Sequence, residues 1–320
     1  MLEFAWNINR IDLSGFDKPD VIIGSSPHPF AALAALRLAR KFGARFFLEL
    51  RDLWPQALVD MGGVSERHPS VKLMRLLEGY LYRKAEKIIV LAEGSKEYLS
   101  NRWKVLPERV IYLPNGVHMD NFTFRDDRDS LRARYGFEKF TLIYTGAHGP
   151  ANSLETILKA AKRIMHHREV EFVLVGDGPV KENLVKRAAE MEINNVRFLN
   201  PVPKSEIPGL IAAADACIIT LRAVDAFSYG ISPNKIFDYM ASKKPVICAV
   251  AGDMADLITR VGAGITVPPE DDESLSRAVI VLSNCSNSEL EKMGQKGYSE
   301  ITRNYSRQEL AKRLLCSINI

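Results

Sequence analysis

Short apolar segments alternate with longer stretches of helical periodicity along the whole chain. The first series of apolar segments comprises Asp20–Gly24, Arg45–Glu49, Lys87–Leu91 and Val110–Leu113. The second series comprises Phe140–Thr145, Glu171–Val175, Asn195–Leu199, Asp215–Ile219, Pro245–Cys248 and Gly264–Val267. Buried strands that alternate with amphipathic helices are typical of βαβ units, which build parallel sheets with helices on both faces. The pattern therefore predicts an α/β protein with two parallel sheets.

The charged segment Arg125–Asp129 separates the two series and predicts a linker. We expect a first domain over residues 1–125, a second over 126–303, and a terminal helix over 304–320 that returns to the first domain. A ligand is then expected in the crevice between the domains. The first series holds about four strands, whereas a doubly wound sheet commonly has about six. We therefore expect the first domain to be incomplete, with its opening β-α-β unit missing.

The stretch Ser228–Ala241 combines a glycine, a helix start and two charged residues. Ser232 is expected to cap the helix and Pro233 to take its first position. Lys235 and Asp238, three residues apart, share a face opposite the apolar face of the helix. A helix N-terminus and a lysine attract an anion, and a carboxylate one turn further can accept hydrogen bonds from two sugar hydroxyls. This combination suits a nucleoside diphosphate, and the equal alternative is a surface helix with a Lys-Asp pair.

The composition is that of a soluble globular protein, with 320 residues, 47% apolar and 26% charged. It excludes disordered and fibrous classes. Residues 1–125 carry 18 Lys and Arg against 14 Asp and Glu, whereas residues 126–320 carry 25 of each. The net charge of +4 therefore comes from the first part of the chain. Such a bias weakly favours an anionic membrane face over an ordinary solvated surface.

Cysteine, histidine and apolar runs give little sign of further chemistry. Cys217, Cys248, Cys285 and Cys316 are widely spaced, which indicates a reduced, cytoplasmic protein. No His, Cys or carboxylate cluster has ligand spacing, so we expect no metal. No run of about 18 apolar residues is present, so any membrane contact is expected to be peripheral.

The segment from Val71 to Lys87 predicts a basic amphipathic helix. Its apolar stripe is Leu73, Leu76, Leu77, Tyr80 and Leu81, and its cations outside that stripe are Lys72, Arg75, Arg83 and Lys84. The favoured interpretation is that the stripe packs on its own sheet while the charges face solvent. The alternative is contact with a lipid-linked acceptor at a membrane surface.

These motifs together resemble the retaining glycosyltransferases of family 4, which have the GT-B fold of two Rossmann-like domains facing across a cleft. The resemblance rests on the Ser228–Ala241 stretch with Lys244-Pro-Val-Ile-Cys-Ala249 after it, and on Leu113–Val117, Val175–Pro179 and Gly252–Asp256. It implies that Asp238 contacts the nucleotide ribose. Gly230 stands where the family usually has a Glu that touches the donor sugar, so the amides of Gly230 and Ile231 are expected to serve there. A subset with the same Ser232-Pro233-Asn234-Lys235 segment does so.

The resemblance also assigns the diphosphate and base positions. The family commonly has an Arg directly after the glycine of the Tyr144–Pro150 loop and a Lys five residues further on, where this chain has Ala147 and Asn152. Lys235 and Arg222, with amides near Gly146 and Ser232, are then expected to balance the phosphates. Gly176 belongs to a second glycine turn of the family. Val202 is expected near the base.

Arg51 and Asp52 are the candidate catalytic pair. They follow the apolar segment that ends at Leu50, at the end of a strand where α/β proteins bind ligands. In the family this place often holds a His, and the subset with an Arg-Asp-Leu-Trp-Pro segment matches Arg51–Pro55. A structural Arg-Asp pair is the alternative, which the position at a strand end makes about half as probable.

The resemblance implies a cytoplasmic, cofactor-independent glycosyltransferase that moves a sugar from a nucleoside diphosphate, UDP first, with retention. The expected sugar is an N-acetylated amino sugar, and the expected acceptor is a glycan or lipid-linked glycan of O-antigen or capsule synthesis. Nucleic acid is not an expected partner. A sugar-nucleotide epimerase on the same fold and a non-catalytic nucleotide-sugar-binding remnant remain alternatives.

Overall fold

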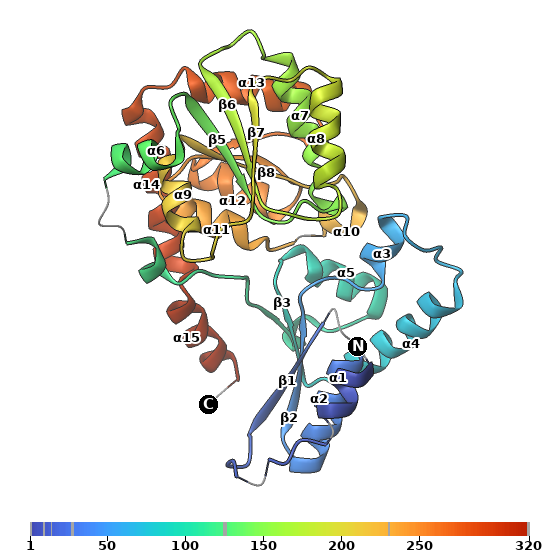
Figure 1. The fold of residues 1–320 in the computed structure, drawn as a ribbon. Helices are drawn as coiled ribbons and strands as arrows, with labels where there is room; N and C mark the ends of the chain where they lie inside the picture. The colour runs from blue at the N-terminus through green and yellow to red at the C-terminus, as the bar shows by residue number, and fades with distance from the viewer. Residues whose placement is uncertain are drawn as a thin grey trace. The chain divides into compact units, whose positions relative to one another are not determined.

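The computed structural model describes residues 2–8, 10–13, 15–26, 29–123, 127–229 and 231–318 (Figure 1). The chain forms two compact units. The first holds the residues up to Pro114, the segment Val224–Ser232, and Ser317 and Ile318. The second holds Asn115–Ala223 and Pro233–Cys316. The division thus falls at Pro114 rather than near residue 125.

The predicted linker Arg125–Asp129 is only partly described, because residues 124–126 lie outside the described residues. Its later part begins a helix, α6 (Arg128–Tyr135). The carboxylate of Asp127 caps this helix by accepting from the amide of Ser130 at 2.9 Å.

The first unit is built on a four-stranded parallel sheet in the order β1-β2-β3-β4. Its strands are β1 (Val21–Ser25), β2 (Arg45–Leu50), β3 (Lys87–Val90) and β4 (Val110–Tyr112). Its helices are α1 (Leu2–Ile8), α2 (Pro29–Phe42), α3 (Gln56–Asp60), α4 (Pro69–Lys84), α5 (Gly94–Trp103), η1 (Pro107–Arg109) and α10 (Asp225–Ser228). Parallel strands require crossovers, and helices provide them here.

The second unit is built on a six-stranded parallel sheet in the order β10-β9-β8-β5-β6-β7. Its strands are β5 (Phe140–Thr145), β6 (Val170–Val175), β7 (Val196–Leu199), β8 (Ala216–Thr220), β9 (Val246–Ala249) and β10 (Gly264–Thr266). This is the order of a doubly wound sheet, whose strand order reverses between β5 and β8. Ligands of such sheets bind outside the carboxyl ends of the strands at that reversal.

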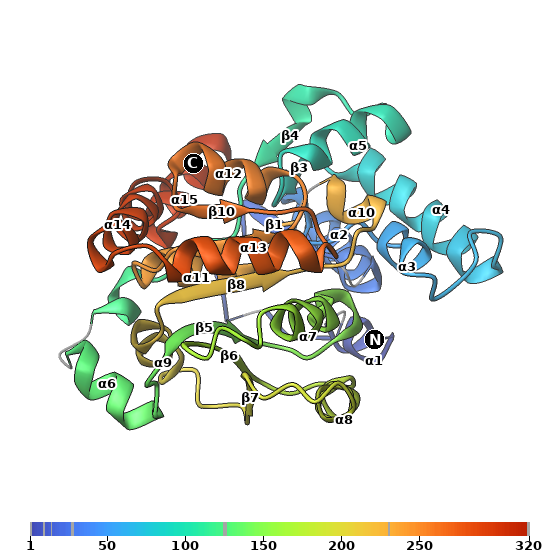
Figure 2. The same ribbon diagram turned by 90° about the horizontal axis from the view of Figure 1, so that it is seen from above.

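Helices cover both faces of the second sheet. These helices are η2 (Met119–Phe122), α6, η3 (Pro150–Asn152), α7 (Leu154–Arg163), α8 (Lys181–Glu190), α9 (Ile207–Ala213), α11 (Asn234–Ala241), α12 (Asp253–Val261), α13 (Asp272–Ser283), α14 (Asn287–Asn304) and α15 (Arg307–Ile318), of which the last ends in the first unit. The largest apolar core lies between the sheet and α7, α8 and α13. Figure 2 shows α13 beside α7, and Figure 1 shows α9, α11 and α14 on the other side of the strands.

All ten predicted strands are confirmed, and so is the α/β class with two parallel sheets. Within the described ranges, no helix is both long and apolar enough to cross a membrane.

The prediction for the faces of α4 is wrong. Leu73 and Leu76 are 61% and 72% exposed. The side chain of Arg75, expected outside, is only 12% exposed, and it forms an ion pair with the buried Glu78 at 3.2 Å. Arg75 also donates to the hydroxyl of Tyr98 at 2.8 Å. Because these partners satisfy a buried guanidinium, the helix can turn a charged side inward and leave two leucines in solvent.

Candidate functional site

Two glycine turns meet at the carboxyl ends of β5 and β6. Gly146 has φ +138° and Gly176 has φ +144°, backbone conformations that favour glycine. The amide of Gly146 donates to the carbonyl of Val175 at 2.9 Å. A Cβ on Gly176 would lie 1.9 Å from the carbonyl oxygen of Gly146. The two turns therefore pack backbone against backbone, as no other residue type would allow.

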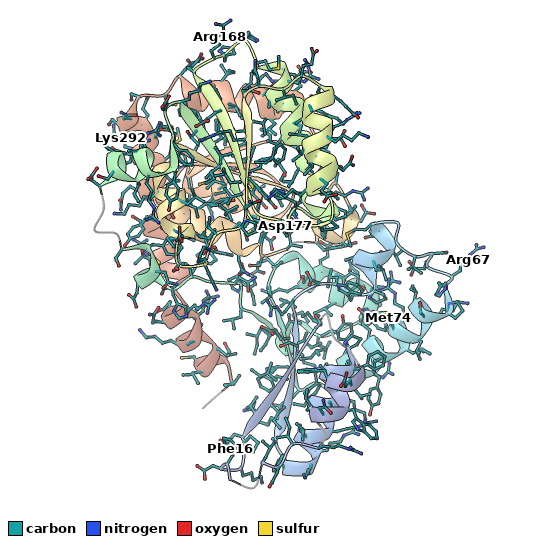
Figure 3. The ribbon with its side chains drawn as sticks, viewed as in Figure 1. Phe16, Arg67, Met74, Arg168, Asp177 and Lys292 are labelled. Atoms are coloured by element: carbon teal, nitrogen blue, oxygen red, sulfur yellow. The ribbon has the colours of Figure 1, made fainter. Side chains whose placement is uncertain are left out.

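The ends of the sheet can be followed in the figures. Figure 3 labels Arg168, which precedes β6, and Asp177, which follows it, at opposite ends of the second unit's strands. The glycine turns lie at the Asp177 end. This is the end at which the reversal of strand order between β5 and β8 favours a ligand.

Lys235 reaches the first glycine turn from the first turn of α11. A Cβ on Gly146 would lie 2.3 Å from Cε of Lys235, so the lysine lies directly against the glycine backbone. Its ammonium is 3.4 Å from Oδ1 of Asn152 and 5.1 Å from the ring centroid of Tyr144. Burial lowers the pKa of Lys235 to about 8, and the carboxylate of Asp238 opposes that shift. A buried cation with such weak partners is well suited to bind an anion.

Ala147 and Asn152, which replace the cations common in the resembling family, support this lysine. The amide group of Asn152 donates to the carbonyl of Ala147 at 3.0 Å while its oxygen faces Lys235. The hydroxyl of Tyr144 donates to the same carbonyl at 2.8 Å. The loop therefore presents one lysine in place of two loop cations.

Asp238 lines a pocket of about 190 Å³ within the second unit. The residues that line this pocket are Gly116, Val117, His118, Asn121, Phe122, Lys204, Ile207, Pro208, Asn234, Asp238 and Arg307. Burial raises the pKa of Asp238 to about 6, and the positive charges of Lys204, Arg307 and Lys235 oppose the shift. The carboxylate is thus ionised at neutral pH and is available as an acceptor.

Val202 and Arg222 lie on loops that follow β7 and β8. The loop with Val202 is anchored by Lys181, whose ammonium donates to the carbonyl of Leu199 at 3.1 Å and to Oδ1 of Asn200 at 3.0 Å. The backbone amide of Arg222 donates to the carbonyl of Ala151 at 3.0 Å. Arg222 therefore lies beside the turn that carries Asn152.

The predicted start of α11 is wrong by one residue. Pro233, with φ −68° and ψ 124°, is the cap, and Asn234 is the first helical residue. Because Pro233 takes the extended cap conformation, Ser232 lies one residue too early for its side chain to cap the helix. Ile231 and Ser232 group with the first unit, while Pro233, Asn234 and Lys235 group with the second. Gly230 lies outside the described residues.

Both units match family models of sugar-transferring enzymes. Residues 139–285 match the model described as glycosyl transferases group 1, and residues 1–116 match the glycosyl transferase 4-like domain. The two matched ranges correspond to the two parallel sheets. The chain belongs to the GT-B glycosyltransferases.

Relatives and solved structures agree with this assignment. This glycosyltransferase is 24% identical over 292 residues to the "Probable glycosyltransferase WbjE" of Pseudomonas aeruginosa, which covers 90% of this chain and 71% of the relative. It is 27% identical to WcaI of Escherichia coli K12, named for colanic acid biosynthesis, over 81% of this chain and 65% of the relative. Anabaena HepE in complex with UDP has a TM-score of 0.77 at 16% identity, covering 99% of this chain and 81% of that one. WaaG, a glycosyltransferase involved in lipopolysaccharide biosynthesis, has a TM-score of 0.68 at 14% identity, covering 93% and 85%.

Arg51 and Asp52 of this glycosyltransferase lie in the first unit, at the carboxyl end of β2. Both side chains are exposed, unlike those of a structural buried pair. The hydroxyl of Ser26 accepts from the amide of Arg51 at 3.0 Å and donates to the carbonyl of Asp52 at 3.3 Å. Partial burial of the carboxylate raises the pKa of Asp52, and the positive charge of Arg51 opposes that shift.

Sequence reasoning missed His148 as a member of the glycine-turn region. The ring of His148 is fully buried, and neither of its nitrogens has a hydrogen-bond partner among the described residues. Burial lowers the pKa of His148, the charges of Lys181 and Lys235 lower it further, and Asp177 opposes them. The imidazole is therefore neutral. A histidine beside Gly149 was visible in the sequence, but the second turn that buries it was not.

No metal site accompanies these groups. Across the described ranges, no three His, Cys, Asp or Glu side chains are grouped so that they could hold a metal ion.

Proposed function

We propose that this glycosyltransferase transfers a sugar with retention from a UDP-sugar to a glycan or lipid-linked glycan in surface polysaccharide assembly. The observation that carries the proposal is the buried ammonium of Lys235 against the Gly146 turn, where the strand order of the second sheet reverses. The names of related proteins support it. HepE was solved with UDP and with UDP-glucose, and WcaI is named for colanic acid biosynthesis.

In this proposal the second unit binds the donor. Lys235 balances the charge of the diphosphate, together with the amides near Gly146 and Gly176 and the guanidinium of Arg222. As the sugar leaves, negative charge grows on the diphosphate, and a fixed cation with oriented amides stabilises that charge. Asp238 accepts from the ribose hydroxyls, and Val202 lies near the base. An N-acetylated amino sugar is the proposed donor sugar.

Arg51 and Asp52 act on the acceptor side in this proposal. Asp52 with a raised pKa is a better general base than an ordinary exposed carboxylate, because its affinity for a proton is closer to that of a reacting hydroxyl. The exposed guanidinium of Arg51 is placed to attract an anionic group of the acceptor or donor.

The exposed face of α4 supports a lipid-linked acceptor. Leu73 and Leu76 are exposed there beside Lys72, Arg83 and Lys84, and no acidic residue of α4 is exposed with them. Apolar side chains among cations suit the surface of an anionic membrane. The protein should sediment with vesicles that contain phosphatidylglycerol and stay in solution with phosphatidylcholine alone. Changing Leu73 and Leu76 to Ser should abolish sedimentation, whereas Val281→Ser on α13 should not; equal sedimentation of all three proteins would remove this contact from the proposal.

The donor assignment is tested by thermal stabilisation. A ligand that binds only the folded state raises stability by RT ln(1 + [L]/Kd). UDP should raise the melting temperature more than GDP or ADP at equal concentration. Equal shifts from the three nucleotides, or none, would contradict the UDP assignment.

A further inference from the structure

The segment Val224–Ser232, which we name the strap, leaves the second unit after β8 and joins the first unit before the chain enters α11. It leads directly to Pro233, Asn234 and Lys235. The strap therefore connects the first unit, along the chain, to the residue that carries the proposed donor site. What holds the strap in place becomes a question about donor binding.

Asp60 holds the strap by capping its short helix. Helix α10 has Val224 at its cap position, and Val224 has no side chain that can accept a hydrogen bond. The carboxylate of Asp60, the last residue of α3, instead accepts from the amide of Ala226 at 2.8 Å. A residue far away in the sequence thus satisfies an amide that a neighbouring Ser or Asp would ordinarily satisfy.

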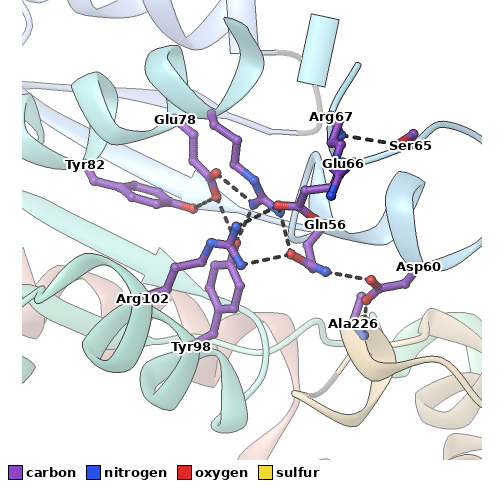
Figure 4. Close-up of polar contacts among 11 residues, drawn as sticks. Gln56, Asp60, Ser65, Glu66, Arg67, Glu78, Tyr82, Tyr98, Arg102 and Ala226 are labelled. Carbon is purple, nitrogen blue, oxygen red and sulfur yellow. Dashed lines mark hydrogen bonds and ion pairs between the residues drawn. The ribbon is translucent and has the colours of Figure 1, made fainter. Parts of the chain in front are cut away.

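A chain of polar contacts fixes Asp60 in turn (Figure 4). The amide group of Gln56 donates to the second oxygen of Asp60 at 2.6 Å. The oxygen of Gln56 accepts from the guanidinium of Arg75, which also binds Glu78 and Tyr98. Because Arg75 and Glu78 are buried, this network has few alternative arrangements. Asp60 is therefore a rigid anchor rather than a mobile surface carboxylate.

The end of the strap is held by a second contact. The ring of Tyr229 packs edge-on against that of Tyr98, with 5.6 Å between centroids. A Cβ on Gly94, at the start of α5, would lie 2.4 Å from the carbonyl oxygen of Tyr229. The backbone of α5 thus lies directly against the strap. The same Tyr98 hydroxyl accepts from Arg75, so both holding points belong to one network.

We propose that Asp60 is a positioning residue for donor binding, which it serves by fixing the strap and through it the entry to Lys235. This inference rests on the proposed function. A segment held in its binding conformation loses less entropy when the ligand binds, so releasing it weakens affinity without removing any ligand contact.

The test compares UDP affinity in three variants of the full chain. Asp60→Ala should weaken UDP binding about three- to tenfold. Asp60→Asn should bind like the parent, because a carboxamide oxygen still accepts from the amide of Ala226. The matched control is Asp271→Ala, which removes an equivalent helix cap, the bond from Ser274 to Asp271 on α13 at 2.8 Å, and should leave UDP affinity unchanged.

The outcomes separate the possible failures. If Asp60→Ala and Asp271→Ala bind UDP equally well, or if Asp60→Asn loses as much affinity as Asp60→Ala, Asp60 has no positioning role. If the parent chain itself binds no UDP, the proposed function fails and this inference fails with it. Hydrogen exchange at residues 224–229, faster in Asp60→Ala than in Asp60→Asn, is expected alongside the affinity loss; unchanged exchange would contradict the anchor.

Discussion

The two parallel sheets end differently at their carboxyl edges. In the second unit, β5 and β6 end in glycine turns packed against each other, with a buried lysine and a neutral buried histidine beside them. In the first unit, β2 ends in Arg51 and Asp52, whose side chains are exposed. One edge is thus a preformed, tightly packed surface for an anion, while the other offers side chains that an incoming molecule can meet. The contrast suggests that donor affinity is set in the second unit and turnover in the first.

The glycine contact predicts the largest effect. Gly176→Ala would place a methyl group 1.9 Å from the carbonyl oxygen of Gly146 and strain a φ of +144°. We expect a loss of about 2–5 kcal/mol in stability and the loss of UDP binding, because the backbone itself must move. The control is Gly149→Ala, where the nearest atom is 3.6 Å away. Equal melting temperatures of the two variants would show that the turns are not tightly packed.

The ribose contact predicts the next largest effect. Asp238→Asn keeps the size of the side chain but removes its charge, and charge-assisted hydrogen bonds contribute roughly 1.5–3 kcal/mol. UDP should bind about tenfold more weakly or worse, as measured by calorimetry. The parent should also lose affinity for 2′-deoxy-UDP, and the variant should not lose it a second time. A variant that binds UDP like its parent would remove Asp238 from the site.

The pH dependence of UDP binding should follow Lys235 and Asp238. The pKa of Lys235 is lowered to about 8, so the ammonium that the diphosphate needs is lost as pH rises above 8. From pH 7 to pH 9 we expect the dissociation constant to rise about five- to tenfold. Below pH 6, protonation of Asp238, whose pKa is raised to about 6, should weaken binding as well. Titration of the ligand itself is common to all variants, so Lys235→Ala should show no weakening between pH 7 and 9.

The smallest effect on donor binding is expected in the first unit. Asp52→Asn should leave the UDP dissociation constant within about twofold while lowering turnover with an acceptor about 100-fold, in the range of lost general base catalysis. Ser26→Ala, which removes only the hydroxyl that links the backbone of residues 51 and 52, is the control for a local distortion. A large change in UDP affinity in Asp52→Asn would erase the contrast between the two sheet edges.

The strands were predictable from the sequence because burial on both faces leaves short, nearly continuous apolar runs such as Phe140–Thr145. The glycine turns were predictable for a similar local reason. The orientation of α4 was not, since the burial of Arg75 depends on Gln56, Glu78 and Tyr98, which only the folded chain brings together. The same applies to Asp60, whose carboxylate caps a helix 166 residues further along the chain. Local patterns therefore located the candidate site, whereas contacts distant in sequence decide what holds it.

Lys235→Ala tests the central claim most directly, by calorimetric comparison of UDP with uridine. Only UDP carries the charge that the ammonium of Lys235 would meet, so the variant should lose about 10- to 100-fold in UDP affinity and little in uridine affinity. Lys186→Ala on α8, where the side chain is 77% exposed, should change neither. Equal losses for UDP and uridine in Lys235→Ala, or no loss for either, would contradict a diphosphate site at the Gly146 turn.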